Sequence, residues 1–125
     1  MLIKLPILHQ EIVDGKLHNT EKLENFELDT SVYSEERWEQ HFPLQAKRES
    51  LFQYVERVRQ DAINDRVKVI SMLKAIFCFI ESDAIPSYKK FAQMFILSEE
   101  EYTTKLLTQL KSAFELVLGS SSVKN

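Results

Sequence analysis

The feature that most constrains the fold is the apolar stretch VKVISMLKAIFCFIES at residues 67–82. At 100° per residue it places one continuous stripe on a helix, formed by Val69, Ile70, Leu73, Ile76, Phe77 and Ile80. Met72 and Phe79 widen this stripe to about half of the circumference. Such a helix must contact several neighbouring elements or a partner, so we expect it at the centre of the domain. It is too short and too often interrupted by charge to span a bilayer.

The composition favours helices over a sheet-based fold. The 125 residues include only two glycines and three prolines, whereas a β-sandwich or barrel needs many turn residues. A chain of this length is expected to form one domain. Cys78 is the only cysteine, which excludes an internal disulfide. The N-terminus lacks the pattern of a signal peptide, so we expect a cytosolic protein.

Residues 1–30 are predicted to be irregular or β. Asp14-Gly15 is a dipeptide typical of a hairpin turn, and apolar residues flank it on both sides. Pro6 lies within the apolar run 2–8, which allows at most an edge strand there. We therefore expect a small β-hairpin or three short strands in this part of the chain.

Four further helices are predicted from apolar periodicity and capping residues. They run from Ser31 or Ser34 to Pro43, over residues 45–63, briefly after Pro86, and from Ser98 to Gly119. The expected fold is mainly α: a compact bundle of about four to five helices around the central helix 67–82, with the small hairpin or short strands near the N-terminus. Residues 1–119 would form this single helical domain, and residues 120–125 a flexible C-terminal tail.

No constellation of residues indicates catalysis. The three histidines are far apart, and only His18 has a candidate metal-binding partner nearby, in Glu21, which is too few ligands for a metal site. Phosphate-binding glycine loops, GxSxG and HExxH are absent from the sequence. We therefore expect no enzyme activity, no metal and no cofactor.

The charge balance argues against a nucleic-acid module. Sixteen basic and nineteen acidic residues give a formal charge of −3, whereas binding to phosphates needs a basic surplus. A small helical DNA-binding or transcription-regulating protein of a phage or prophage remains the alternative. Its best recognition helix would be residues 45–63, where Arg48, Arg57 and Arg59 are interspersed with acids.

One pattern of residues resembles a known family. It comprises EERW at residues 35–38, Phe42-Pro43, the aromatic-rich LFQYVERV at 51–58, and FCFIESDAIP at 77–86. With the flanking segments this covers about three-quarters of the chain, from Glu27 onward. The pattern is similar to that of the small tail assembly chaperones of long-tailed (siphovirus-type) phages and prophages of Gram-positive bacteria.

The resemblance implies a mostly helical, non-catalytic assembly factor. Such a protein acts in the cytoplasm of the host cell and is absent from the mature virion. Its partners would be the tape measure protein, which it holds soluble, and the tail tube protein, with a homo-oligomer possible and no membrane involved. An apolar helix is held in a hydrophobic groove, so apolar residues at stripe margins are the candidates for partner binding. These are Phe52, Met72 and Phe79.

Overall fold

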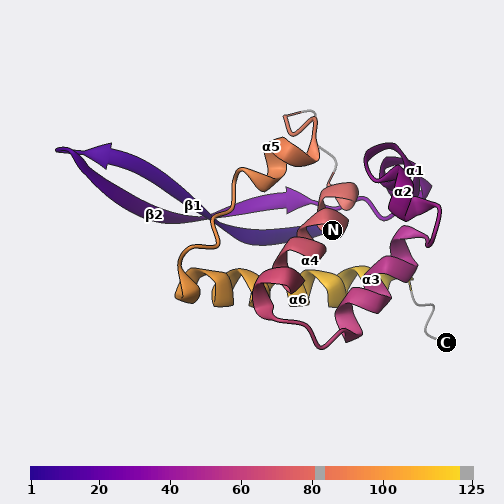
Figure 1. Ribbon diagram of the computed structural model, residues 1–125. Coiled ribbons are helices and arrows are strands. Elements are labelled where there is room, and N and C mark those ends of the chain that lie inside the picture. Colours follow the sequence, from indigo (N-terminus) through magenta and orange to yellow (C-terminus); the bar gives the residue numbers. More distant parts are fainter. Residues whose placement is uncertain (81–83, 122–125) are drawn as a thin grey trace.

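The computed structural model describes residues 1–80 and 84–121. Within these residues the chain forms two strands and six helices (Figure 1). In order they are β1 (Leu2–Val13), β2 (Lys16–Glu27), α1 (Val32–His41), α2 (Pro43–Ala46), α3 (Leu51–Gln60), α4 (Asp65–Phe79), α5 (Tyr88–Ala92) and α6 (Glu100–Ser121). The fold is α+β, so the expectation of a mainly α bundle is wrong. None of the helices in the described residues is long and apolar enough to cross a membrane.

The correction comes from the hairpin, whose two strands have 12 residues each. The strands pair antiparallel from Leu2↔Glu27 to Val13↔Lys16. Asp14 and Gly15 have φ angles of 52° and 75°, as a two-residue type I′ turn requires. Sequence periodicity underestimated β2 because all its residues except Phe26 are exposed, so neither face carries an apolar pattern.

The base of the hairpin is covered on both faces. Successive side chains of a strand point to opposite faces, and Ile7 and Leu8 are both buried. On one face the Tyr102 hydroxyl of α6 donates a hydrogen bond to the Pro6 carbonyl at 2.7 Å. On the other, the rings of Phe26 and Phe91 of α5 pack edge to face at 6.0 Å. Figure 1 accordingly shows α5 and α6 on opposite sides of the two strands.

Helix α4 takes the central place expected for residues 67–82. It contacts α1, α3, α5 and α6, and every residue from Ala75 to its end is buried. Asn64 caps its start by accepting a hydrogen bond from the Val67 N–H at 3.0 Å. After the helix, Ile80 pairs with Leu28, which joins the end of α4 to the hairpin. Positions 81 and 82 of the expected helix lie outside the described residues.

The single helix predicted for residues 45–63 is two helices, α2 and α3. Ser50 and Gln53 form a reciprocal capping box that starts a new helix at Leu51. Helix α6 likewise differs at its ends, because it begins at Glu100 and continues through Gly119 to Ser121. Gly119 therefore does not end this helix, and residues 122–125 of the expected tail lie outside the described residues.

Candidate functional site

The EERW segment joins three helices. Glu35 accepts hydrogen bonds from the backbone N–H groups of Leu51 at 2.9 Å and Phe52 at 3.3 Å, so it caps the start of α3. The other two contacts involve Arg37, which donates to a carbonyl of α4 at 2.9 Å, and Trp38, whose indole N–H donates to the Glu49 carbonyl at 3.0 Å. This part of the pattern therefore holds α1, α3 and α4 together and has a structural role.

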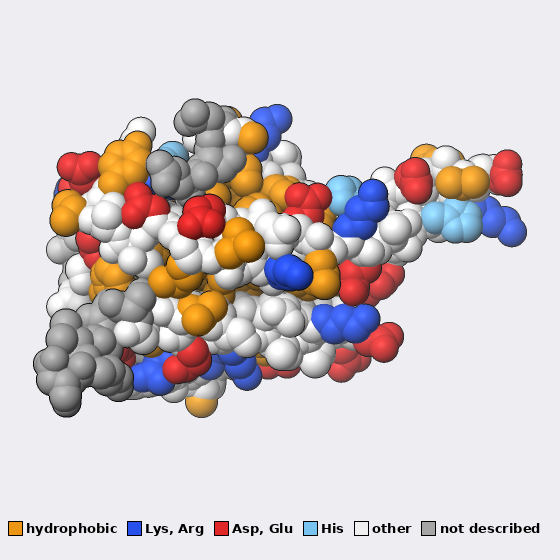
Figure 2. Space-filling model, turned by 180° about the vertical axis from the view of Figure 1, so that it is seen from behind, with side chains coloured by type: hydrophobic (Ala, Val, Ile, Leu, Met, Phe, Trp, Pro, Cys, Tyr) orange, Lys and Arg blue, Asp and Glu red, His pale blue; other side chains and the backbone are white. Residues whose placement is uncertain are grey.

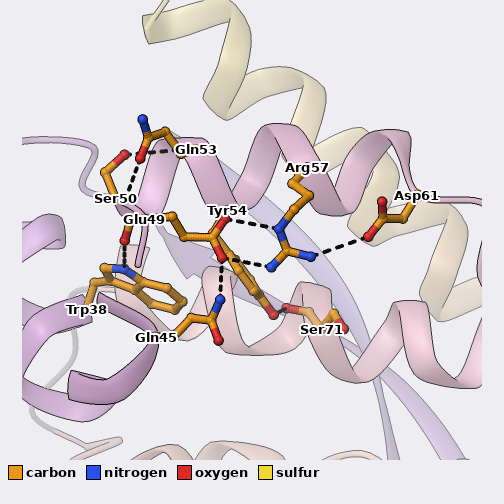
Figure 3. A network of polar contacts seen from close by, with 9 residues as sticks. All are labelled: Trp38, Gln45, Glu49, Ser50, Gln53, Tyr54, Arg57, Asp61 and Ser71. Atoms are coloured by element: carbon orange, nitrogen blue, oxygen red, sulfur yellow. Dashed lines mark hydrogen bonds and ion pairs between the residues drawn. The ribbon is translucent and has the colours of Figure 1, made fainter. Parts of the chain in front are cut away.

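A polar network continues from Trp38 along α3 (Figure 3). Arg57 binds Glu49 through two hydrogen bonds of 3.0 and 2.8 Å and contacts Asp61 at 3.4 Å. Gln45 donates to the same Glu49 carboxylate. The hydrogen bond from Arg57 is the main cause that lowers the pKa of Glu49. Glu49 therefore stays ionised, and it connects the start of α3 with the end of that helix.

This network bears on the DNA-binding alternative. Arg57 is engaged by Glu49 and Asp61, and Arg59 lies 3.5 Å from both Glu56 and Glu115. Two of the three arginines that a recognition helix would use to bind phosphates are therefore already paired with acidic side chains. The apolar side of α3 is buried against the core. No surface of α3 combines free positive charge with the exposure that a major-groove helix needs.

Metal-binding side chains do not gather in the described residues. No set of three or more His, Cys, Asp or Glu side chains in the described part of the chain lies close enough to hold a metal ion. Cys78 is buried inside α4, and this burial raises the pKa of its thiol to about 12. A thiolate nucleophile is consequently not available at neutral pH.

The residues expected to face a partner are placed differently by the structure. Met72 and Phe79 are only 1% and 0% exposed, so the expectation that they lie at an outer margin is wrong. Phe52 is half-buried, and its ring packs against Phe79 with a centroid distance of 5.6 Å. The physical reason is that the C-terminal half of α4 is enclosed on all sides, so its whole circumference is used inside the domain.

The exposed apolar surface of α4 lies instead at its N-terminal end. Val67 and Ile70 are 46% and 43% exposed. They line an open groove of about 880 Å³ between the first turns of α4 and α6, together with Leu97 from the segment before α6. Sequence periodicity places Ile70 on the apolar stripe of the helix. The charged residues around Ile70 could have indicated that it is exposed, because Asp65, Arg66 and Lys68 all lie on this half of the helix.

Most neutral polar groups of the groove already have partners. The Asn64 side chain accepts from the backbone of α4. The hydroxyls of Thr103 and Thr104 donate to the Glu99 and Glu100 carbonyls at 2.8 and 3.1 Å. The remaining lining consists of the apolar Val67, Ile70 and Leu97 with charged side chains beside them, and such a lining suits the apolar side chains of a protein segment better than a small polar ligand.

A second exposed apolar surface lies at the tip of the hairpin. From His9 outward both strands are exposed, and they leave the body as an arm (Figure 2). Ile12 and Leu17 face each other across the two strands, with exposures of 75% and 61%. Residues 9–20 are called the arm below, and the groove between α4 and α6 is called the α4–α6 groove.

No family model, curated protein or solved structure matches this chain. The arguments for a function therefore come from the residue pattern and from the surfaces described above.

Proposed function

We propose that this protein is a tail assembly chaperone of a long-tailed phage or prophage of Gram-positive bacteria. In this role it holds the tape measure protein soluble in the host cytoplasm and helps recruit tail tube protein during tail morphogenesis. It acts by binding, without catalysis, and does not remain in the mature virion. The residue pattern at 35–38, 42–43, 51–58 and 77–86 is the source of the proposal.

The observation that carries the proposal is the α4–α6 groove. A protein that holds a long amphipathic helix needs an open apolar channel into which the anchors of that helix can insert. Val67, Ile70 and Leu97 supply apolar surface on the floor of the groove, which is open to solvent. The charged residues that line the groove are Asp65, Arg66 and Glu100, and this excess of one negative charge would favour a client helix with basic residues beside its apolar face.

The structural part of the pattern supports the same proposal. Glu35, Arg37 and Trp38 each bond to a different segment of the backbone, so replacement of any one would loosen the body of the domain. Residues with such connections specify a framework, whereas the surface of that framework can vary with the client. The alternative of a DNA-binding protein is less well supported, because Arg57 and Arg59 contact carboxylates.

The test is co-expression with the tape measure protein encoded in the same genome. We expect the wild-type chaperone to keep that protein soluble and to copurify with it. Ile70→Asp, which puts a charge on the floor of the groove, should abolish both effects. Leu44→Asp is the matched control, since Leu44 is an exposed apolar residue on α2, away from the groove. A tape measure protein that stays insoluble beside the wild-type chaperone would contradict the proposal.

A further inference from the structure

The outer part of the hairpin extends beyond the helices that cover its base. A two-stranded hairpin alone is at best marginally stable in water, and three strands or a covering helix are normally needed. Here the body covers the base of the hairpin, but the side chains from His9 to Val13 and from Lys16 to Glu24 are all exposed. An arm that ends in two opposed apolar residues, Ile12 and Leu17, is therefore suited to contact another surface.

The arm cannot reach the α4–α6 groove of its own chain. Asn19 donates a hydrogen bond to the Glu99 carboxylate at 2.5 Å, and Glu21 lies 3.6 Å from Lys105. These contacts lie at the inner end of the arm, beside the start of α6, and beyond them the paired strands lead away from the body (Figure 1). No arm residue lines the groove. Two exposed apolar surfaces of one chain are thus held apart.

We infer that the arm of one copy inserts its tip into the α4–α6 groove of a second copy. The tip offers Ile12 and Leu17 side by side, and the groove offers Val67, Ile70 and Leu97 as an apolar floor. From His9 to Val13 the arm extends roughly 14 Å at the usual rise of a strand. This length lets the tip enter a neighbouring groove while the two bodies stay apart.

The charges of the two surfaces are complementary. Asp14 and Lys16 flank the turn at the tip, while Arg66 stands at the rim of the groove with Asp65 and Glu100. None of these five side chains makes an ion pair within the described residues of one chain. Each sign on the tip would thus have a residue of opposite sign available at the groove, which favours a second copy over an uncharged apolar partner.

An arm on one copy meets a groove on another, so two copies can exchange arms in a closed symmetric pair or bind head to tail. In head-to-tail association, an open row of copies keeps one unused arm at one end and one unused groove at the other until a ring closes. The same groove is the proposed client site, and a client helix would displace the arm of the neighbouring copy. The self-association itself does not depend on the identity of that client.

The test uses the purified protein alone, by sedimentation velocity over a range of concentrations. We expect wild type to associate with increasing concentration. Leu17→Asp at the tip and Ile70→Asp in the groove should each weaken association by at least roughly tenfold, as for loss of a central anchor. Leu44→Asp is the surface control and should behave as wild type. Both test positions are exposed, and circular dichroism checks that each variant is folded.

Mixing the two variants gives the sharpest readout. Leu17→Asp retains a groove and Ile70→Asp retains an arm, so an equimolar mixture should form a 1:1 dimer and nothing larger. A wild-type protein that stays monomeric, a mixture that stays monomeric, or normal association of Ile70→Asp would each overturn the inference. None of these results depends on the tape measure protein, so they are separate from failure of the proposed function.

A cross-link gives an independent check. Cys78 is buried, so its thiol can stay in both variants and should not form disulfides in this experiment. Leu17→Cys in one preparation and Val67→Cys in another should form an intermolecular disulfide when mixed under mild oxidation. Replacing the second variant by Leu44→Cys should reduce the yield to the background level. Equal yields with both variants would show that the tip does not select the groove, and would overturn the inference.

Discussion

Arg37 holds the C-terminal end of α4 through Phe77 in two ways. Its Nη2 donates a hydrogen bond to the Phe77 carbonyl at 2.9 Å, and its guanidinium lies 5.4 Å from the centroid of the Phe77 ring. A positive charge at the C-terminal end of a helix also interacts favourably with the helix dipole. One buried arginine of α1 therefore combines a hydrogen bond, a cation–π contact and a dipole interaction.

Arg37→Met should destabilise the fold while keeping much of the side-chain volume. We expect a loss of about 1.5–3 kcal/mol in the free energy of unfolding, the usual range for a hydrogen bond to a charged group. Urea denaturation measures this loss. Arg48→Met is the matched control, because Arg48 is exposed, and it should stay within about 0.5 kcal/mol of wild type. Equal effects of the two replacements would contradict the role of Arg37.

Glu35→Ala should weaken the start of α3. Its carboxylate accepts from the Leu51 and Phe52 N–H groups, which have no partner within their own helix. Loss of this cap should cost about 1–2 kcal/mol, in the range of an N-cap replacement. Glu36→Ala provides the comparison at the next position, where the side chain is exposed, and should have little effect. Thermal unfolding of the two variants distinguishes them, and similar melting temperatures would argue against the cap.

The stability of the protein should fall below about pH 6.5 because of His41. Burial, and then the positive charge of Arg37, lowers the pKa of His41 from its ordinary value of 6.5. The unfolded chain therefore binds this proton more readily than the folded one. The stability contributed by neutral His41 is complete above pH 6.5 and is lost as the pH falls through the folded pKa. In His41→Gln the difference in unfolding free energy between pH 7.5 and 5.5 should shrink, and an unchanged difference would count against this assignment.

The thiol of Cys78 should react only when the protein opens. Burial raises its pKa to about 12 and removes it from solvent. With a colorimetric disulfide reagent at pH 8 we expect negligible labelling of the native protein and one equivalent in guanidinium chloride. Leu44→Cys places a second thiol at an exposed position and should react at once under native conditions. Fast labelling of the native wild type would mean that α4 is less enclosed than the structure indicates.

The sequence predicted those elements whose signals are local. The turn at Asp14-Gly15, a cap at one of the two candidates Ser31 and Ser34, and the central helix α4 all follow from short-range patterns, and the structure places the cap at Ser31. The length of the hairpin did not, because β2 is exposed on both faces and Pro6 suggested only a short edge strand. Pro6 is tolerated in β1 because a two-stranded sheet has an open edge on each strand.

The candidate site was predicted less well than the fold. An amphipathic pattern shows which residues of α4 are apolar, but it does not show how far neighbouring elements extend along the helix. Helix α4 packs against α1, α3, α5 and α6, and Met72 and Phe79 are buried in this packing, whereas Val67 and Ile70 are exposed. Whether an apolar residue of α4 is buried or exposed therefore depends on tertiary packing, which periodicity does not show.

The sandwiching of the hairpin base has a consequence during protein synthesis. Tyr102 bonds to a carbonyl 96 residues earlier in the chain, so β1 leaves the ribosome long before α6 exists to cover it. At the usual rates of translation this delay lasts roughly five to twenty seconds. An uncovered apolar strand is prone to pair with other nascent chains, and a proline within it removes one donor from such pairing. Pro6 thus makes the strand a poorer template for aggregation while it waits for the last helix.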